Sequence, residues 1–469
     1  SDSSDSAAVE TAPVSTLPPG PNSTGVYTTV NATEHADMAR THVFEHATFG
    51  GSLDDPESNQ AFVRTAPGFY PGTYNVVTRN ADEIFVYYGV YGEQEGAVGP
   101  AVARLDADTL EEVWNTQLAV YDDNATAWNY PGVIGLHGNG TLIVVSGNTA
   151  AVIDPDTGEI INQVDLPQDD PANASYNGFI TTSDGTLFTK ALFRSCDTVG
   201  SPALVECLDT EVAQTMLAID PVTLEIIDQI ELPDFATGRI PIGVHNGIDY
   251  VYLPGVSSLY RYRWEDETLT LDEDWGFVTV AEEGDLTALT PNLTEDWAFL
   301  QVNTGSPKPM PVWAISTSDS SVRHSIRPFE ETPAFASFNA AHGSFDPDSG
   351  LLYAADTGAG RGSALAFDPE TGFEIRWVEE QTMSVFQQLV DSPDRRVLVT
   401  NELVNFPLNP LAATNEQVVF RDAATGREVA RTDELPRMSQ GANISPGFDG
   451  RVYFPGVDGK LYEITVRSE

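Results

Sequence analysis

The chain is poor in lysine and cysteine and contains no long hydrophobic run. Among its 469 residues, 23 are basic and 70 are acidic, and the only lysines are Lys190, Lys308 and Lys460. The net charge of −47 excludes binding to nucleic-acid phosphates and to anionic membrane surfaces. No apolar stretch approaches the roughly 18–20 residues of a membrane-spanning segment, so no transmembrane segment is expected.

The familiar sequence signatures of catalysis are also missing. The chain contains no H-E-x-x-H, no G-x-S-x-G, no P-loop and no cysteine-based zinc pattern. The glycine-rich run at 358–364 falls between two expected strands, which indicates a tight turn and not a phosphate-binding loop. These absences favour a non-catalytic binding or structural role.

The residue types that are abundant indicate a protein located outside the cytoplasm. Abundant acid with scarce lysine is typical of proteins that stay soluble in high salt, although an acidic, GC-rich genome leaves a similar mark. Residues 1–24 are rich in Ser, Thr, Pro and Ala and offer little to bury, so we expect an N-terminal arm or tether, such as a stalk behind a lipid anchor. The chain starts at Ser1, which is typical of a mature, processed product.

Covalent modifications fit the same compartment. Cys196 and Cys207 are the only cysteines, and outside the cytoplasm we expect them to form a disulfide; in a cytosolic protein they would be free thiols. Seven N-x-[ST] sequons would accept glycans in an archaeal or eukaryotic surface protein; they lie at Asn22, Asn31, Asn124, Asn139, Asn173, Asn292 and Asn443.

An internal repeat predicts the fold. An apolar strand, a D-x-x-T-G-like turn and an alternating strand recur at 103–118, 151–166, 217–232, 365–380 and 418–435. Weaker copies follow the same pattern at 259–275 and 312–329. Aspartate caps such a turn through its side chain, and glycine takes the positive φ that closes it. Another strand pair precedes each copy, so each unit of about fifty residues contains four strands, as in a propeller blade.

We therefore predict one all-β domain over residues 25–469, an eight-bladed β-propeller with blades from about residue 74; seven blades are the alternative. The last unit, 440–466, supplies only three strands. An N-terminal strand within 25–49 is expected to complete it and close the ring, which removes the exposed edge.

The repeats IDPDTGEI, LDADTLEEVW and FDPETGFEIRW resemble the PQQ-like repeats of quinoprotein-type propellers. This superfamily includes quinone-dependent alcohol and sugar dehydrogenases and non-catalytic scaffolds of outer-membrane assembly. The resemblance implies the architecture, but the chain lacks the adjacent-cysteine disulfide that commonly clamps the quinone in alcohol dehydrogenases. It also lacks C-x-x-C-H, the attachment motif of c-type haem. We therefore expect neither PQQ nor haem.

Histidines give the strongest candidate site. His137, His245 and His342 occupy nearly the same place in the second, fourth and sixth repeats, close to the innermost strand. If they face the axis, neutral imidazoles could bind Cu, Fe or Zn there, with His42 and His46 as further ligands. The alternative is that each bonds locally to backbone.

Two weaker candidates lie elsewhere. The Asp154/Asp156 and Asp346/Asp348 turns offer carboxylates to Ca²⁺, although a turn supplies few oxygens and capping explains the aspartates equally well. The aromatic segment 69–74 with Tyr87, Tyr88 and Tyr91 could stack on a sugar or pack between blades.

Two functions from different classes remain open. The first is a secreted or cell-surface propeller that binds a protein or glycan, or assembles into a homo-oligomer or filament through its N-terminal arm. The second is a metal-dependent oxidoreductase or hydrolase with an axial site formed by His137, His245 and His342.

Overall fold

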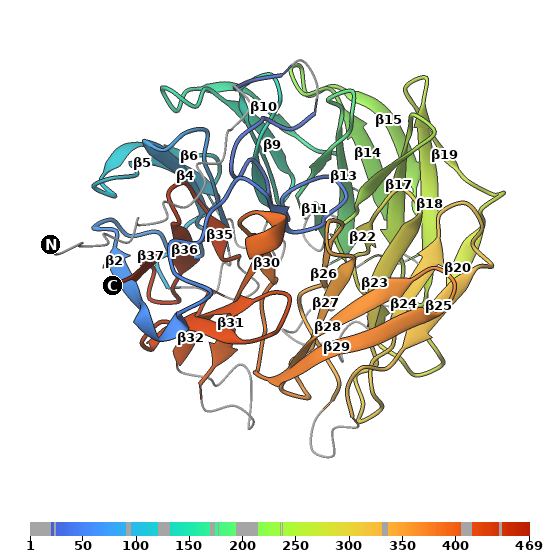
Figure 1. Cartoon of the computed structure of the whole chain (residues 1–469). Helices are drawn as coiled ribbons and strands as arrows, with labels where there is room; N and C mark the ends of the chain where they lie inside the picture. The colour runs from blue at the N-terminus through green and yellow to red at the C-terminus, as the bar shows by residue number, and fades with distance from the viewer. Residues whose placement is uncertain are drawn as a thin grey trace, which may run out of the picture.

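Eight β-sheets follow one another around a ring in the described part of the computed structural model (Figure 1). The structure describes residues 20–22, 25–90, 95–120, 132–168, 174–176, 178–193, 214–234, 236, 238–330, 336–404, 415–439 and 443–469. The sheets are antiparallel apart from one short parallel strand, β1. The chain is thus an eight-bladed propeller, as predicted, and the seven-bladed alternative is wrong.

The blades run in chain order, and within each blade the strands run from the axis outward (Figure 1). Blades one and two contain β3 (Asn75–Val77), β4 (Glu83–Tyr88), β5 (Ala101–Asp106) and β6 (Glu112–Gln117), then β7 (Val133–Leu136), β8 (Leu142–Ser146), β9 (Thr149–Ile153) and β10 (Ile160–Asp165). Blades three and four contain β11 (Ala174–Tyr176), β12 (Ile180–Thr181), β13 (Leu187–Phe193), β14 (Thr215–Ile219) and β15 (Ile226–Glu231), then β16 (Ile242–His245), β17 (Ile248–Pro254), β18 (Ser258–Glu265), β19 (Thr268–Leu271) and β20 (Phe277–Thr279).

The second half of the ring repeats this arrangement. Blades five and six contain β21 (Thr287–Ala288), β22 (Asn292–Leu293), β23 (Trp297–Asn303), β24 (Val312–Ser316) and β25 (Arg323–Ile326), then β26 (Ser344–Asp346), β27 (Leu351–Asp356), β28 (Arg361–Asp368) and β29 (Gly372–Glu380). Blades seven and eight contain β1 (Val43–Phe44), β30 (Gln388–Val390), β31 (Val397–Leu403), β32 (Asn415–Asp422), β33 (Glu428–Arg431) and β34 (Leu435–Pro436), then β35 (Ser445–Pro446), β36 (Val452–Pro455), β37 (Leu461–Ser468) and β2 (Asn59–Thr65). Two short 3₁₀ turns are described, η1 (Pro56–Ser58) and η3 (Pro393–Arg395).

The repeated turns have the predicted chemistry. In each one, an oxygen of the motif aspartate accepts hydrogen bonds from the backbone N–H groups two and three residues later; the aspartates are Asp106, Asp154, Asp220, Asp368 and Asp422. The residue four positions after the aspartate has positive φ in every copy, and it is glycine at 158, 372 and 426. Leu110 and Leu224 take the same conformation, at φ 59° and 60°.

The ring closes with a later segment than the sequence suggests. β2 pairs antiparallel with β37 from Asn59↔Ser468 to Thr65↔Tyr462, and so forms the outer strand of blade eight. The expectation that this strand lies within 25–49 is wrong. Residues 59–65 are regular extended backbone, whereas His35, Ala36, Arg40 and His42 all have positive φ, which interrupts a long strand.

Residues 25–49 instead cross the middle of the ring. Backbone carbonyls of this segment accept N–H groups from the inner edges of six blades; the acceptors are Gly25, Asn31, Ala32, Met38, Ala39, Thr41, His42 and Ala47. Val43 and Phe44 then pair with Leu389 and Val390 of β30 as the short parallel strand. A segment that contacts the first strands of so many blades occupies the centre of the ring, where the dark-blue trace runs in Figure 1.

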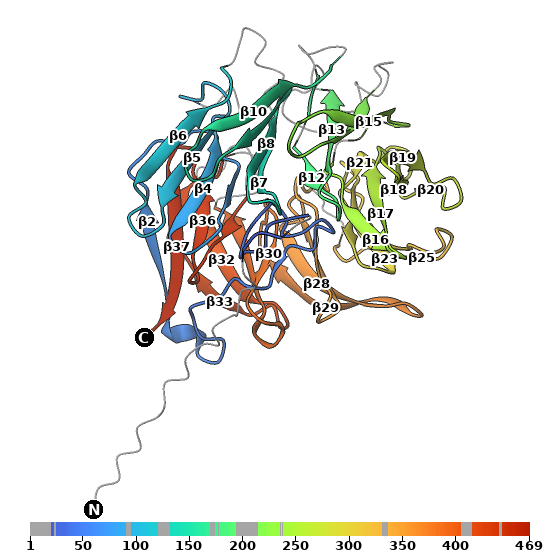
Figure 2. The ribbon, with the colours of Figure 1, turned by 90° about the horizontal axis from the view of Figure 1, so that it is seen from above.

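The inner strands of a blade are more buried than its outermost strand. Every residue of β8 and β9 is buried, whereas β10 alternates between half-buried and exposed positions. The hydrophobic core is thus divided among the interfaces between neighbouring blades. Figure 2 shows the same sheets after a 90° turn. No described helix has the length and hydropathy needed to cross a membrane.

Candidate metal centre in the middle of the ring

Sharp backbone turns bring two histidines of the N-terminal segment together. The N–H of His42 donates to the carbonyl of His35 at 3.2 Å, which closes a loop of eight residues. Positive φ at four positions of this loop makes so tight a path possible. The ring centroids of His35 and His42 are therefore 4.5 Å apart, and both residues are completely buried.

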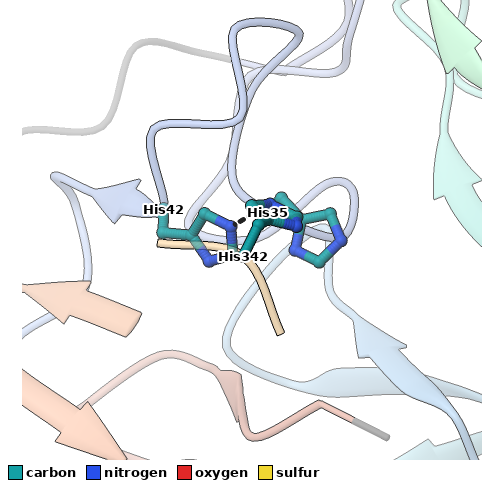
Figure 3. A group of neighbouring side chains, drawn as sticks. All are labelled: His35, His42 and His342. Carbon is teal, nitrogen blue, oxygen red and sulfur yellow. Dashed lines mark hydrogen bonds between the residues drawn. The ribbon is translucent and has the colours of Figure 1, made fainter. Parts of the chain in front are cut away.

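The third histidine comes from the far side of the sequence. His342 lies in the loop that leads into β26, the innermost strand of blade six, and is 5% exposed. Its Nε2 lies 2.8 Å from Nε2 of His42, as the dashed line in Figure 3 shows. One ring nitrogen from each of His35, His42 and His342 falls within 4.8 Å of the others, which is close enough for one metal ion.

Gln388 fixes the tautomer of His42. The Gln388 amide N–H donates to the carbonyl of Ile444 at 2.9 Å, so its Oε1 faces His42 and accepts a hydrogen bond from Nδ1, also at 2.9 Å. With the proton on Nδ1, the lone pair of Nε2 points to His342. A carbonyl that orients the outer nitrogen of an imidazole is the usual support of a metal-binding histidine.

Glu34 plays the corresponding role for His35. Nε2 of His35 lies 3.2 Å from Oε2 of the buried Glu34 carboxylate, at ion-pair distance but without hydrogen-bond geometry, and Nδ1 has no hydrogen-bond partner among the described residues. Although burial opposes ionisation, Arg239, His35 and Arg40 hold the pKa of Glu34 well below its usual value. An ionised carboxylate on one ring nitrogen leaves the other free to bind a cation.

The three imidazoles are neutral at physiological pH. Burial lowers the pKa of His35 to about 4, although the Glu34 carboxylate acts in the opposite direction. Burial together with the adjacent histidines lowers the pKa values of His42 and His342 well below 6.5. Phe386 packs against all three rings, with centroids 4.2, 5.4 and 4.9 Å away. Neutral imidazole donors suit Cu, Zn or Fe.

The ring nitrogens would have to rearrange to reach metal geometry. Metal–nitrogen bonds of about 2.0–2.1 Å at tetrahedral angles place two ligand nitrogens about 3.3 Å apart. The Nε2 atoms of His42 and His342 are 2.8 Å apart and would separate by about 0.5 Å, whereas the three nitrogens are spread over up to 4.8 Å, so His35 would have to approach the other two. The proton that now lies between the two nitrogens belongs to Nε2 of His342, because Nε2 of His42 accepts it. To bind a metal through Nε2, neutral His342 would carry this proton on Nδ1 instead.

The other predicted histidines lie outside this group. His137 Nε2 contacts the Gly185 carbonyl at 2.8 Å, and its Nδ1 accepts the backbone N–H of Asn139. His245 Nε2 lies 2.7 Å from the Tyr252 hydroxyl, and His46 lies beside Glu45. His342 and His42 thus join the cluster, whereas His137 and His245 make local hydrogen bonds. His35 is the member that sequence reasoning missed, and its only signal was its position in the same segment as His42.

The aspartate turns are occupied by hydrogen bonds and ion pairs. Arg396 donates to Asp346 at 3.1 Å and to Asp348 at 2.9 Å, so a guanidinium stands where Ca²⁺ would bind. Asp154 caps its own turn, and Asp156 pairs with Arg79 at 2.7 Å. These contacts favour the capping interpretation over calcium binding.

The aromatic candidates are mostly internal. Tyr70, Tyr74 and Tyr87 are at most 2% exposed, which leaves no ring face for a sugar; Phe69 is 51% exposed, and Tyr91 lies outside the described residues.

The sequons fall into two structural groups. Asn31, Asn292 and Asn443 are at most 3% exposed, and Asn31 and Asn292 each donate to two backbone carbonyls. Such asparagines have no room for a glycan in the folded chain, whereas Asn22 and Asn139 are exposed. Asn124, Asn173, Cys196 and Cys207 lie outside the described residues.

Comparison with known proteins places the fold. No family model matches the chain, and no curated protein matches its sequence. Among solved structures, the quinohemoprotein alcohol dehydrogenase from Comamonas testosteroni has a TM-score of 0.58 at 11% identity, covering 92% of this chain and 80% of that chain. Quinohemoprotein alcohol dehydrogenase ADHIIG from Pseudomonas putida HK5 has a TM-score of 0.59 at 10% identity, covering 94% and 80%.

A europium-containing methanol dehydrogenase is similar to the same extent, with a TM-score of 0.57 at 9% identity, covering 92% of this chain and 89% of that chain. Identities this low relate the folds and carry no activity across. The predicted resemblance is confirmed at that level: the chain has the propeller fold of the quinoprotein dehydrogenases.

Proposed function

We propose that the protein is a secreted or cell-surface propeller that holds one transition-metal ion with His35, His42 and His342, and that this ion is structural. The observation that carries the proposal is the convergence of three buried, neutral imidazoles, two of them oriented from behind by Gln388 and Glu34. Without an ion, His42 and His342 share a hydrogen bond; an ion would use one nitrogen from each of the three rings.

Burial argues for a structural ion over a catalytic one. His35 and His42 are completely buried, and His342 is 5% exposed. Phe386 and the N-terminal segment cover the cluster, whereas catalytic metal sites keep a position open to substrate or water. The ion would connect the N-terminal segment to the loop before β26, so that binding and closure of the ring centre stabilise each other.

With the centre filled by the chain itself, partners would bind on the outside of the ring. We place a protein or glycan partner, or a second copy of the chain, on these outer surfaces, with residues 1–24 as the tether to the cell surface. The acidic composition and the polar arm support this location.

Thermal unfolding with and without metal tests the proposal. Chelator-treated protein should gain about 2–3 °C in Tm when Zn²⁺ or Cu²⁺ is added at about 100 times Kd, a stabilisation of about 2.7 kcal/mol. The variant His342→Ala should lose this gain. His324→Ala removes a histidine on the outer strand β25 and should keep it.

Two outcomes would contradict the proposal. If neither ion changes the Tm of the wild-type protein, no metal binds at the centre. If the bound ion exchanges ligands freely with small molecules such as azide, the site is open, and the alternative of a metal-dependent enzyme is favoured.

A further inference from the structure

β2 is the outermost strand of blade eight, at the rim of the ring (Figure 1), and its outer edge has no partner strand in the described part of the chain. The N–H of Ala66 donates to the Leu461 carbonyl, so the even-numbered residues of β2 direct their backbone groups at β37 and the odd-numbered ones direct theirs outward. No described residue bonds to the N–H groups of Ala61, Val63 or Thr65. Such an edge is a template for pairing with another strand.

β2 lacks the usual protection of a sheet edge. Proteins commonly blunt an edge strand with lysines, proline or a bulge. β2 has seven residues in unbroken register with β37, contains neither lysine nor proline, and exposes Phe62 (43%) and Val63 (39%). Its one charged residue, Arg64, is paired with Glu463 at 2.8 Å. The edge is therefore apolar at its centre and suited to a strand partner.

The charge of blade eight indicates which partner fits. β2 and residues 443–469 carry four basic and four acidic side chains, in a chain of net charge −47. The basic ones are Arg64, Arg451, Lys460 and Arg467, and the acidic ones are Asp449, Asp458, Glu463 and Glu469. In physiological salt, charges beyond about 8 Å are largely screened, so the local charge decides. A neutral surface selects neither a basic nor an acidic peptide, and it lets two copies of this acidic chain approach each other with little repulsion.

The sequence of β2 is also complementary to itself in antiparallel register. With a two-fold axis at Phe62, Ala61 of one copy pairs with Val63 of the other, and the free backbone groups of both residues form the hydrogen-bonded pairs. Phe62 then faces Phe62 of the second copy at a non-hydrogen-bonded position, where side chains are closest. The Cα atoms of the two Arg64 residues would lie about 14 Å apart, so no like charges face each other.

We propose that two copies of the chain pair through β2, antiparallel about Phe62, so that the two eighth blades form one continuous sheet. Such a contact uses the same surface on both copies and closes on itself, which gives a dimer. This inference rests on the proposed placement of partners outside the ring and selects a second copy among them. It does not require the metal ion.

Sedimentation velocity over a range of protein concentrations tests the proposal. The wild-type protein should form a dimer, and the dimer fraction should rise between 0.1 and 1 M salt as the repulsion between the acidic copies is screened. Val63→Pro removes an outward N–H and leaves the bonds between β2 and β37, so it should abolish the dimer. Val63→Thr keeps the N–H and should keep the dimer. A wild-type protein that stays monomeric at millimolar concentration, or a dimer that survives Val63→Pro, would overturn the proposal.

Charge reversal covers the case in which Val63→Pro fails to fold. Phe62→Glu and Phe62→Lys each place two like charges opposite each other at the two-fold axis, so each variant should be monomeric. An equimolar mixture of the two should recover the dimer, and a mixture that stays monomeric would overturn the proposal. The gain in Tm on adding Zn²⁺ or Cu²⁺ should be the same in Phe62→Glu as in the wild-type protein, which separates failure of the dimer from failure of the metal centre.

Discussion

At the scale of single residues, the histidine cluster depends on one amide that touches no metal. Gln388 is 1% exposed and holds the Nδ1 proton of His42. We predict that Gln388→Leu lowers metal affinity 10- to 100-fold, the usual cost of losing such a support. Titration calorimetry of chelator-treated protein measures this change.

Gln417→Leu is the matched control for this prediction. Gln417 donates to the Thr432 carbonyl in blade seven, away from the cluster, and its loss should leave metal affinity unchanged. Equal affinities for Gln388→Leu and the wild-type protein would show that the amide does not orient a ligand.

His245 gives the protein a dependence on pH that is independent of the metal centre. Burial, and then the charge of Arg261, lowers the pKa of His245 to about 4 in the folded state. The unfolded chain takes up a proton near pH 6.5 and the folded chain does not, so stability falls as the pH drops from about 6.5 towards 4.

We therefore predict that the stability of His245→Gln falls less steeply than that of the wild-type protein as the pH drops from about 6.5 towards 4. Urea unfolding at a series of pH values should show that the variant takes up fewer protons on unfolding than the wild-type protein, by up to one, between pH 6.5 and 4. Parallel curves for the two proteins would mean that His245 titrates normally when folded.

Two of the three clustered histidines were candidates from the sequence, and the third was not. His342 attracted attention through its place in the repeat, and His42 through its position in the N-terminal segment. His35 has neither repeat equivalence nor a motif. Its role depends on Glu34 and on a contact with His342, some 300 residues away. Local patterns do not encode such long-range contacts.

At the scale of elements, the repeated turns connect neighbouring blades. Gly158 has φ 76°, and a Cβ at this position would lie 2.6 Å from the indole of Trp114 in the preceding blade. Trp114 also donates to the Pro155 carbonyl of the same turn. In the same way, Trp377 packs against Gly426 and donates to the Ala423 carbonyl. The glycine thus permits both the turn and the docking of the tryptophan.

We predict that Gly158→Ala destabilises the protein more than Gly350→Ala. Gly350 occupies an equivalent turn at φ 71°, with open space around its Cβ direction, so its substitution costs only the backbone strain of about 1–2 kcal/mol. Gly158→Ala adds a clash with Trp114 to the same strain. Urea denaturation compares the two variants; equal losses would show that the indole moves aside without cost.

The elements were largely predictable because turns and strands are local. The D-x-x-T-G copies indicated the blades, and their aspartates cap as expected. The closing strand was predicted in the wrong segment because both 25–49 and 59–65 precede the first blade. Nothing in the sequence shows which of the two segments pairs with the last strand. The two segments differ in what they contact. Residues 25–49 bond to the inner strands in the middle of the ring, and β2 pairs with the free edge of β37.

At the scale of the whole molecule, the net charge of −47 opposes the compact state by self-repulsion. We predict that the urea midpoint rises as salt increases from 0.1 to 1 M, because the screening length falls from about 10 to about 3 Å. Sodium gluconate and sodium chloride should both raise it. A midpoint independent of salt would contradict this view of the surface charge.

The central claim is that three buried histidines in the middle of the ring hold one metal ion. A crystal structure of the metal-loaded protein, with anomalous data on both sides of the absorption edge of the metal, tests it most directly. We predict one peak per chain, at about 2.0–2.1 Å from a ring nitrogen of each of His35, His42 and His342. A metal-free cluster with His42 and His342 still hydrogen-bonded to each other under these conditions would contradict it.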